Sequence, residues 1–267
     1  MWFMALEGGG VAGEEPGRAP RLVPLEPRYH GPRRAQARAR AQDMDPQPQG
    51  KASPLVVENL ARIRATTLAM GDKVDEAIQR ATDGLLHRDI ATSNEVIRGD
   101  AEVNALQAET RQLCFTTILG QAPPARELRE LLGFQHMAAE LERMADHCVN
   151  IARVARDLAD LPPLEDYVDI PKLSSLVAKQ VRDILTALVS HDIDEARAVA
   201  ARDDLINRLY HRLVDELIQI MSDDPARVYQ GTKLITACQN YERIADRVTN
   251  LAEDLVFLEA GDIEDLG

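Results

Sequence analysis

Aromatic residues make up only 4% of the 267 residues, and the chain contains no long uninterrupted apolar run. Aromatic side chains favour pleated strands, and a transmembrane helix needs about 18 or more consecutive apolar residues. The three cysteines (Cys114, Cys148 and Cys238) are widely spaced and form no Cys-x-x-Cys pair. They therefore exclude a disulfide framework or zinc knuckle and fit a reducing cytosol. These absences favour a helical protein without a transmembrane helix.

Acidic residues outnumber basic residues, since the chain has 44 Asp and Glu but only 31 Lys and Arg, which gives a formal net charge of −13 at pH 7. Non-specific nucleic-acid binding requires clustered Lys and Arg that neutralise phosphates. An anionic membrane surface would likewise repel such a chain. The charge therefore argues against nucleic acid as a partner.

The first fifty residues differ in composition from the rest, since they hold half of the 14 prolines and nearly half of the 15 glycines. Such a segment cannot bury enough apolar surface to offset its ordering entropy, so we predict residues 1–52 to be a disordered extension. Gly8, Gly10 and Gly13 match a dinucleotide-binding pattern, but no strand or helix pattern flanks them, which excludes that interpretation. Initiation of translation at Met44 is an alternative that would remove most of the extension.

From Leu55 onward, apolar residues recur at steps of three and four, which is typical of amphipathic helices. Breaks near residues 87–89 and 120–124 divide the first half into three long helices. After a proline-containing linker the pattern starts again, and it predicts helices over 176–188, 193–221 and 228–257. The short connections predict antiparallel neighbours. The expected organisation is an all-α fold of two tandem three-helix bundles at 53–160 and 172–260, a linker at 161–171 and a tail at 261–267.

The two halves form an internal repeat. Around the second helix of each half, residues match at an offset of 103, as in Asp100 and Asp203. In the third helices the offset is 100, and Glu-Arg-x-Ala-Asp-x-x-x-Asn occurs at both 142–150 and 242–250. Apolar periodicity repeats by chance in amphipathic helices, whereas a set of polar identities is harder to explain in that way. The repeat therefore points to a shared role for these polar residues.

Glu142 and Asp146 lie one turn apart on a helix, beside its apolar face rather than opposite it. Carboxylates four residues apart on a helix repel each other, and the sequence contains such a pair in both repeats. One interpretation is a solvated ion-pair face compensated by neighbouring arginines. The other is a pair of cation sites, because carboxylate oxygens suit hard metal ions and the neighbouring helix offers further oxygens. The candidate ligands are Glu142, Asp146, Glu242, Asp246, Asp100 and Asp203, with Asn104, Asn207, Asn150 and Asn250 as further candidates. Asn150 and Asn250 have the alternative role of bridging between helices.

With these motifs, the chain resembles the PhoU family of regulators of bacterial phosphate uptake over roughly residues 55–260. Two positions depart from the family pattern: Ala145 and Ala245 stand where the family often has Gly, and Arg247 stands where the first half keeps His147. The resemblance implies a non-enzymatic cytoplasmic homodimer, attached peripherally to the membrane through its partners. It also implies bound iron or another metal ion, for which Mn, Zn and Mg are the alternatives.

The resemblance further implies negative regulation of phosphate uptake and of phosphate-starvation signalling. In that role the protein would link the ATPase of a phosphate ABC transporter to a membrane histidine kinase. Arg129, Arg143 and Arg243 are candidate partner-binding residues, because few aromatic side chains are available as anchors. Two alternatives compete with this interpretation. A helical scaffold without metal remains open, whereas a di-iron carboxylate enzyme is disfavoured because none of the six histidines follows a Glu by three residues.

Overall fold

The structure is a computed structural model that describes residues 51–162, 169–261 and 264–267. In this part of the chain the secondary structure is entirely helical. Most of the predicted extension at 1–52 and the middle of the predicted linker lie outside the described residues, as do Met44 and the glycines near the N-terminus. The helices are α2 (Pro54–His87), α3 (Ile90–Gln121), α4 (Ala125–Asp157), α5 (Ile170–Ser190), α6 (Ile193–Ala200), α7 (Asp203–Asp223), the 3-10 helix η1 (Pro225–Arg227) and α8 (Val228–Ala260).

The three helices of the first half follow the predicted pattern, and their ends have local physical causes. Ser53 caps α2 by accepting a hydrogen bond from the backbone N–H of Val56 at 3.3 Å, and Pro54 lies in the first turn, where its missing N–H costs nothing. Asp89 caps α3 through the N–H groups of Ala91 and Thr92. The apolar periodicity and these caps therefore agree on the same boundaries.

The repeat extends to the backbone between helices. Arg88 ends α2 with φ +59°, and His191, which is 103 residues later, ends α5 with φ +56°. Both residues adopt the left-handed conformation that terminates a helix, although neither is glycine. Asp89 and Asp192 then cap the next helix in each half through their side chains. The same turn therefore joins the first two helices of both repeats.

One predicted element is wrong. The helix expected over 193–221 is divided into α6 and α7 by a turn at Ala201 and Arg202. At this turn the N–H of Arg202 donates a hydrogen bond to the carbonyl of Val199 at 3.1 Å. The backbone hydrogen-bond pattern therefore changes from i to i−4, as in an α-helix, to i to i−3, as in a 3-10 turn. No proline or glycine marks this break, so the residue pattern does not predict it. In addition, α5 begins at Ile170, six residues before the expected helix, with Pro171 in its first turn.

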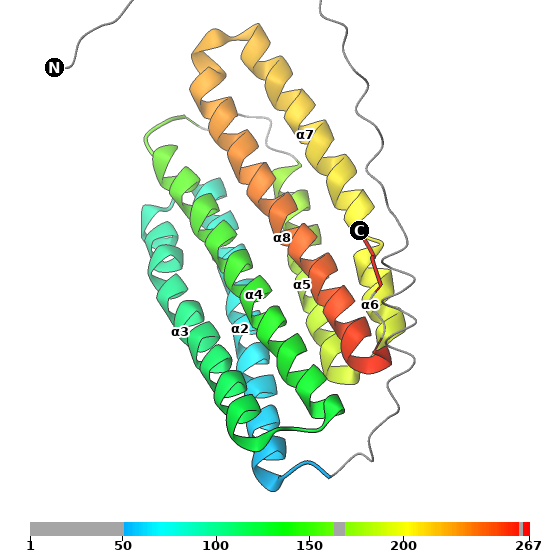
Figure 1. The fold of residues 1–267 in the computed structure, drawn as a ribbon. Helices are drawn as coiled ribbons and strands as arrows, with labels where there is room; N and C mark the ends of the chain where they lie inside the picture. Colours follow the sequence, from blue (N-terminus) through cyan, green and yellow to red (C-terminus); the bar gives the residue numbers. More distant parts are fainter. Residues whose placement is uncertain (1–50, 163–168, 262–263) are drawn as a thin grey trace, which may run out of the picture. The chain divides into compact units, whose positions relative to one another are not determined.

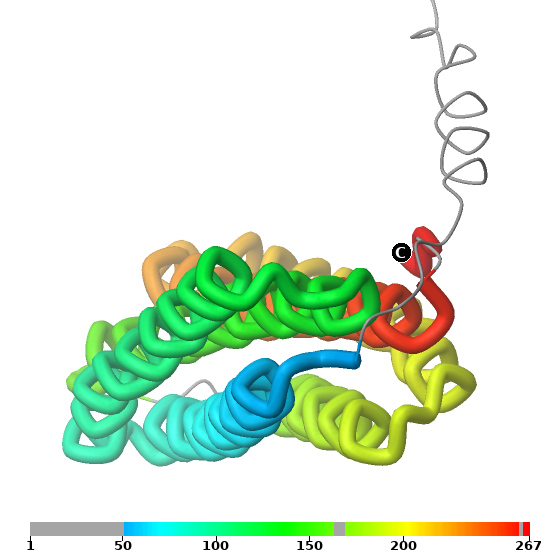
Figure 2. Tube along the Cα trace, turned by 60° about the horizontal axis from the view of Figure 1, so that its bottom comes forward, coloured from blue at the N-terminus to red at the C-terminus, as the bar shows by residue number. Residues whose placement is uncertain are grey.

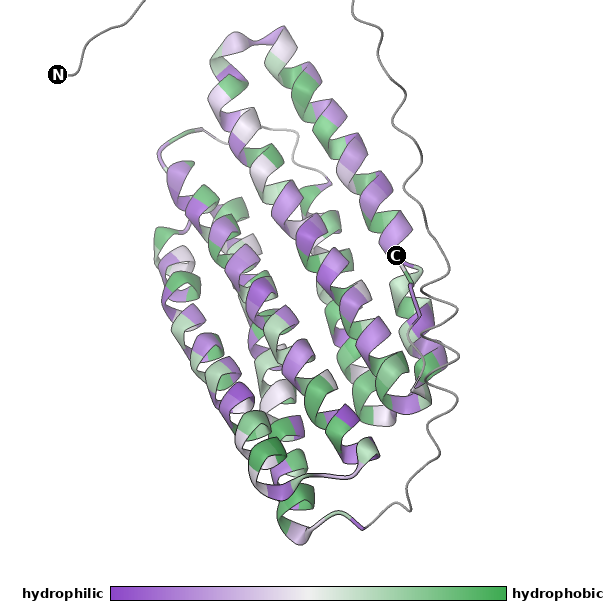
Figure 3. Cartoon of the chain, in the orientation of Figure 1, coloured by the Kyte–Doolittle hydropathy of each residue, from purple (hydrophilic) through white to green (hydrophobic). Residues whose placement is uncertain are grey.

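The two repeats share one hydrophobic core. Figure 2 shows α4 and α8 in one layer and α2 and α5 in the other, and each of these pairs is in direct contact. Figure 1 shows α3 flanking α2 and α4 on one side, with α6 on the opposite side beside α8. Apolar and polar residues alternate along every helix in Figure 3, and the buried apolar residues of all these helices form one cluster. Fully buried Tyr241 joins the layers, because its hydroxyl lies 2.7 Å from Oγ1 of Thr82 on α2.

Candidate metal centre and the interface between the repeats

The packing of α3 against α4 brings together the three carboxylates predicted in the first half. Glu142 and Asp146 lie on α4, and Asp100 approaches them from α3. Burial raises the pKa of Glu142, and the charges of Asp146 and Asp100 raise it further. Burial and the charge of Asp146 likewise raise the pKa of Asp100. The three groups therefore act on one another as a partly buried anionic cluster, which we call the first carboxylate cluster.

The second half repeats this arrangement with α7 and α8. Asp203 begins α7, and its pKa is raised by burial and by the charge of Asp246 on α8. The pKa of Glu242 is raised by burial and by Asp246, with a smaller contribution from Asp203. Burial also raises the pKa of Asp246, against the opposing effect of the nearby Arg243 and Arg247. Asp203, Glu242 and Asp246 form the second carboxylate cluster.

One oxygen in each cluster is buried without a hydrogen-bond partner in the described part of the chain. Oδ2 of Asp100 accepts from Nδ2 of Asn104 at 2.8 Å, and Oδ2 of Asp203 accepts from Asn207 at 2.7 Å. The other oxygen, Oδ1, of both aspartates has no such partner. Buried oxygens are normally satisfied. An unsatisfied carboxylate oxygen beside further carboxylates matches the chemistry that a hard cation requires.

The clusters are not preformed cages. Within residues 51–162, 169–261 and 264–267, no three His, Cys, Asp or Glu side chains are placed so that they could hold a metal ion together. Asn104 and Asn207 point their amide nitrogens at Asp100 and Asp203, so they orient these aspartates as they stand. A cation would have to draw the carboxylates together or complete its shell with water.

Asn150 and Asn250 bridge helices α4 and α8. Nδ2 of Asn250 donates to Oε2 of Glu140 at 2.8 Å, and Nδ2 of Asn150 donates to Oδ1 of Asn240 at 3.4 Å. These contacts match the bridging role that the sequence left open for both residues, here between side chains. The two acceptors, Glu140 and Asn240, occupy equivalent positions in the repeats, because each lies two residues before the Glu of its motif.

Glu140 is a buried charge that the sequence analysis missed. It lies on α4 with 2% of its surface exposed, and its carboxylate is 3.3 Å from Nη1 of both Arg143 and Arg247. At the symmetric position of the second repeat, Asn240 instead bonds to Nδ1 of His147 at 2.9 Å. Burial lowers the pKa of this histidine, which favours its neutral form. Charged Glu140–Arg247 and neutral Asn240–His147 are thus equivalent pairs across one interface.

A comparison of equivalent residues in α4 and α8, which are 100 positions apart in the sequence, already indicates this interface. Between the repeats, position 140 changes from Glu to Asn and position 147 changes from His to Arg. These two positions lie seven residues apart on one face of the helix. A change of charge at both positions suggests that they contact each other's counterparts across a shared interface between the repeats. Further along, His136 Nδ1 lies 2.7 Å from Asp254, where the symmetric positions hold Thr236 and Val154. The charged half of the interface therefore extends over two helical turns.

The three candidate partner-binding arginines lie in different surroundings. The guanidinium of Arg129 lies 5.7 Å from the centre of the Phe257 ring. Arg143 is paired with Glu140, and Arg243 lies 3.7 Å from its neighbour Glu242. About half of the side-chain surface of Arg143 and of Arg243 is exposed, at 57% and 48%. Both remain open to an external partner beside the carboxylate clusters. Within the described residues, no helix combines the length and the apolar character needed to cross a membrane.

Known proteins are similar to this chain in both sequence and architecture. The model of a family described as the PhoU domain matches residues 67–155 and again 170–255. A phosphate-specific transport system accessory protein PhoU homolog from Aquifex aeolicus is 34% identical over 206 residues, which cover 77% of this chain and 93% of that protein. The homolog from Clostridium acetobutylicum is 30% identical over 209 residues, which cover 78% and 95% of the two chains.

Solved structures agree with this result. The crystal structure of PhoU from Pseudomonas aeruginosa has a TM-score of 0.74 and 28% identity, and the match covers 77% of this chain and 99% of that one. The phosphate transport system regulatory protein PhoU from Streptococcus pneumoniae has a TM-score of 0.69 and 26% identity, with 79% and 99% covered. These names describe accessory and regulatory proteins and not enzymes. With two copies of the domain over most of its length, the chain belongs to the PhoU family of accessory proteins.

Proposed function

We propose that this protein is an accessory protein of a phosphate transport system that binds metal cations at its two carboxylate clusters. The observation that carries the metal proposal is the pair of buried, unpartnered Oδ1 atoms on Asp100 and Asp203, two aspartates that each interact electrostatically with a Glu and an Asp of the neighbouring helix. Asp100, Glu142 and Asp146 would hold one cation, and Asp203, Glu242 and Asp246 the other. The cation would neutralise carboxylates whose mutual repulsion opposes folding.

Iron is one candidate metal, with manganese, zinc and magnesium as the others, because carboxylate oxygens accept all of these ions. The first test measures metal content by mass spectrometry on protein purified without added metal or chelator. The comparison protein carries Ala at Glu142, Asp146, Glu242 and Asp246. Bound metal that is lost in the folded variant supports the proposal. Absence of metal in both proteins, with equal thermal stability, would leave the alternative of a helical scaffold without metal.

The regulatory part of the proposal concerns signalling. We propose a cytoplasmic homodimer that represses phosphate uptake and phosphate-starvation genes. It would do so by joining the ATPase of a phosphate ABC transporter to a membrane histidine kinase, and would thereby be held peripherally at the membrane. The state of the transporter would change how the protein docks, and docking would shift the kinase away from its active state. Its support is family membership together with two exposed arginines, Arg143 and Arg243, next to the clusters.

This part is tested by deleting the gene and measuring a phosphate-starvation reporter at high phosphate. Constitutive expression that is restored to repression by the wild-type gene supports the proposal. Arg143→Glu together with Arg243→Glu should fail to restore repression if these side chains contact a partner, and the matched change Arg98→Glu together with Arg208→Glu serves as the control. Unchanged reporter expression after deletion would contradict the regulatory role, whatever the metal content.

A further inference from the structure

Helix α3 lies at the edge of the molecule, where it packs against α2 and α4 (Figure 1). Its buried side chains, such as Val103 and Cys114, lie on the face toward these two helices. The side that is turned away from them carries exposed residues at alternating steps of four and three. We call this side the outer face of α3, and it consists of Ala101, Ala105, Ala108, Gln112, Phe115 and Leu119.

The outer face is largely apolar although it is open to solvent. Phe115 and Leu119 have 60% and 74% of their surface exposed. On a helical wheel, the arc of about 100° around this face holds no Asp, Glu, Lys or Arg between Ile90 and Leu119. The exposed side of an amphipathic helix is normally charged or polar. An exposed apolar strip of this length therefore indicates a surface that another molecule covers.

The second repeat provides an internal comparison. At the offset of 103, the positions of the outer face hold three charged residues and a histidine on α7. They are Asp204, Arg208, Asp215 and His211, in place of Ala101, Ala105, Gln112 and Ala108. The exterior of α7 is thus charged, as expected of a solvated helix. The absence of charge is specific to α3 and does not follow from the shared fold.

We propose that the outer face of α3 binds a second copy of this chain, with the two α3 helices antiparallel about a twofold axis between Asn104 and Ala105. This inference rests on the homodimer of the proposed function and assigns its interface. In a twofold interface every contact occurs twice. Ala101 then lies against Ala108 of the second copy on both sides of the axis. Such small side chains allow two helices to pack closely.

The large apolar side chains of α3 lie toward its two ends, which suits this arrangement. Leu119 would meet Ile90 of the second copy, which is 44% exposed in the single chain. Phe115 would meet Asn94 and Ile97 in the same way. Large residues at one end of the helix therefore cover apolar residues at the other end of the second copy, and burial of this surface drives association.

Charge selects the position of the axis. Antiparallel helices related by a twofold axis place each flank of one helix beside the same flank of the other. On one flank Arg98 then faces Glu109 of the second copy, and on the other flank Arg111 faces Asp100. An axis at Thr110 would instead bring the two copies of Arg111 together, and likewise the two copies of Glu109. Opposite charges thus favour the axis between residues 104 and 105.

These charges are not consumed within one copy. Arg98 donates to the carbonyl of Asn94 at 3.2 Å, and neither Arg98 nor Arg111 forms an ion pair with another described residue. Glu109 pairs with Arg62, but 43% of its side-chain surface remains exposed. Its second carboxylate oxygen can therefore accept a hydrogen bond from Arg98 of the second copy.

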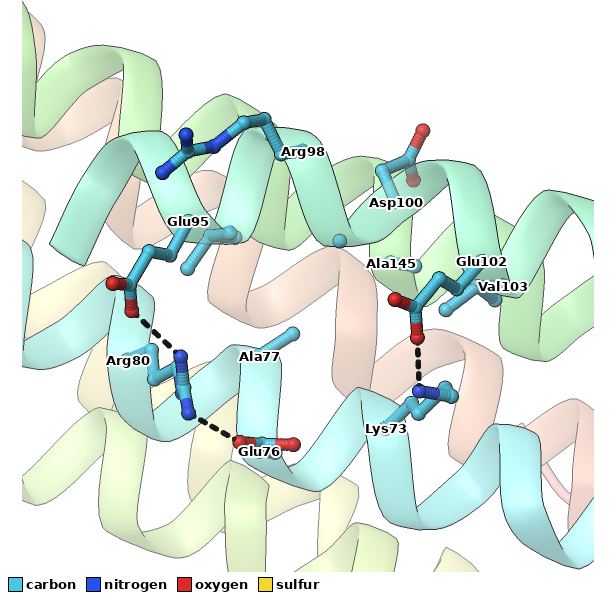
Figure 4. A pocket seen from close by; sticks show the side chains of 12 residues that line it. Lys73, Glu76, Ala77, Arg80, Glu95, Arg98, Asp100, Glu102, Val103 and Ala145 are labelled. Carbon is cyan, nitrogen blue, oxygen red and sulfur yellow. Dashed lines mark hydrogen bonds and ion pairs between the residues drawn. The ribbon is translucent and has the colours of Figure 1, made fainter. Parts of the chain in front are cut away.

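The remaining acidic residues of α3 are directed toward α2. Figure 4 shows Glu95 and Glu102 turned to α2, where they form ion pairs beside a hollow of about 350 Å³. Arg98 and Asp100 point away from α2 in the same view. The two arginines of α3 and its two other carboxylates, Glu109 and Asp100, therefore form complementary flanks of the outer face.

The size of the face predicts a weak dimer. At a rise of about 1.5 Å per residue, the stretch from Ile90 to Leu119 is about 44 Å long, and a width of about 10 Å gives roughly 440 Å² per copy. The total of roughly 900 Å² lies below the range of about 1,200–2,000 Å² that is typical of stable complexes. We therefore expect reversible dimerisation with a dissociation constant of roughly 10–100 μM.

Sedimentation velocity of the metal-free, full-length protein between about 5 and 500 μM measures this equilibrium. Ala108→Asp with Leu119→Asp places carboxylates in the contact and should weaken dimerisation by about tenfold or more. The same changes at the equivalent exposed positions of the second repeat, His211→Asp with Ser222→Asp, add the same residues and should keep the dissociation constant within about twofold.

The outcomes separate this inference from the proposed function. A dimer that the α3 variant leaves unchanged overturns the inference, while the homodimer of the proposed function stands. A monomer at every concentration overturns both and leaves the outer face to a different partner. Metal content and reporter repression test the rest of the proposed function and do not depend on this result.

Charge reversal tests the position of the axis. Arg98→Glu and Glu109→Arg should each weaken dimerisation, because like charges then face each other at both copies of the pair. An equimolar mixture of the two variants should dimerise more tightly than either variant alone. In the mixed dimer one pair keeps its native charges and the other exchanges them. A mixture that is no tighter than the separate variants overturns the antiparallel arrangement.

Cross-linking provides a second measurement if the aspartate variant fails to fold. The three native cysteines are buried, so oxidation should join copies of Ala105→Cys through the new residue, which lies beside the axis. Arg208→Cys, at the equivalent position of the second repeat, is the control and should form little cross-linked dimer. Equal cross-linking of the two variants would overturn the assignment of the interface to α3.

Discussion

The first repeat has an uninterrupted second helix, α3, whereas the second repeat divides the corresponding segment into α6 and α7. In the first repeat a glycine leaves the groove against α2 open. In the second, Arg202 turns into the equivalent groove and pairs with Asp183 and Glu195. The comparison teaches that duplication preserved the carboxylate clusters while the grooves beside them diverged. In the second repeat Arg202 bridges the two helices of the groove, whereas the groove of the first repeat contains a hollow lined by charged side chains.

The α4–α8 interface diverged in a second way, through exchange of charge. One end holds Glu140 with Arg247, and the symmetric end holds Asn240 with His147. Each combination is internally consistent, because a buried carboxylate needs a cation and a neutral amide can bond to a neutral imidazole. The two positions must therefore change together. Because of this coupling, substitutions at the α4–α8 interface are the most sensitive test of how the two repeats differ.

The largest effect is expected from Glu140→Ala. Removing one member of a buried ion pair leaves Arg247 without its charge partner, which should lower the free energy of unfolding by about 3 kcal/mol. Asn240→Ala removes only neutral hydrogen bonds and should cost about 1 kcal/mol. Urea denaturation of both variants measures the difference. Equal losses would show that the two ends of the interface are energetically alike.

The exchange can be tested directly with Glu140→Asn and Arg247→His combined, which gives the charged end the residues of the neutral end. The double variant should recover about 1–2 kcal/mol relative to the sum of the two single variants, because the residues are in contact. A double-mutant cycle from denaturation curves measures this coupling. Strict additivity would contradict the interpretation of the two positions as a matched pair.

A smaller loss is expected at the bond between the layers. Tyr241→Phe removes the hydroxyl that contacts Thr82 and should cost about 1 kcal/mol. The symmetric residue of the first repeat is Leu141, which has no hydroxyl. Thermal unfolding of Tyr241→Phe should therefore show a lower Tm, by about 2–4 °C for a protein of this size. A volume-conserving control, Leu141→Met, should change the Tm less, and the reverse ranking would argue against a role for the hydroxyl.

The smallest effect concerns the carboxylate cluster without metal. Burial, Asp146 and Asp100 raise the pKa of Glu142, so the folded state disfavours its ionised form. The stability contributed by the protonated form is present at low pH and is lost as the pH rises through this raised pKa. Glu142→Gln should therefore raise the Tm of the metal-free protein at pH 7 by about 1 °C, since a like-charge pair costs a few tenths of a kcal/mol.

Two measurements distinguish this effect from a general charge effect. The advantage of Glu142→Gln should shrink as the pH falls toward 4, and exposed Glu58→Gln should show no such advantage at any pH. Addition of Mn²⁺ should raise the Tm of the wild type more than that of the variant, because a bound cation removes the repulsion and stabilises the folded state. A wild type that is already the more stable protein without metal would contradict the expected repulsion.

Much of the fold could be predicted because the relevant signals are local. Apolar residues at three- and four-residue steps specify amphipathic helices, and capping residues such as Ser53 and Asp89 mark where they begin. The approach of Asp100 to Glu142 and Asp146 also followed from antiparallel packing of consecutive helices. The break at Ala201 and Arg202 could not be foreseen in this way. At this break the side chain of Arg202 pairs with Asp183 on another helix, and no local residue type indicates such a contact.

The sequence by itself determined the helices, the duplication and the carboxylate motifs, since each depends on residue types at fixed spacing along one helix. Only the tertiary structure decided that the two repeats share one core, that Glu140 is buried opposite Arg247, and that the groove at Gly99 is open while its counterpart is filled. These features depend on which faces of helices from different repeats meet. Burial, and with it the cost or benefit of each charge, is a property of that contact and not of the spacing within either helix.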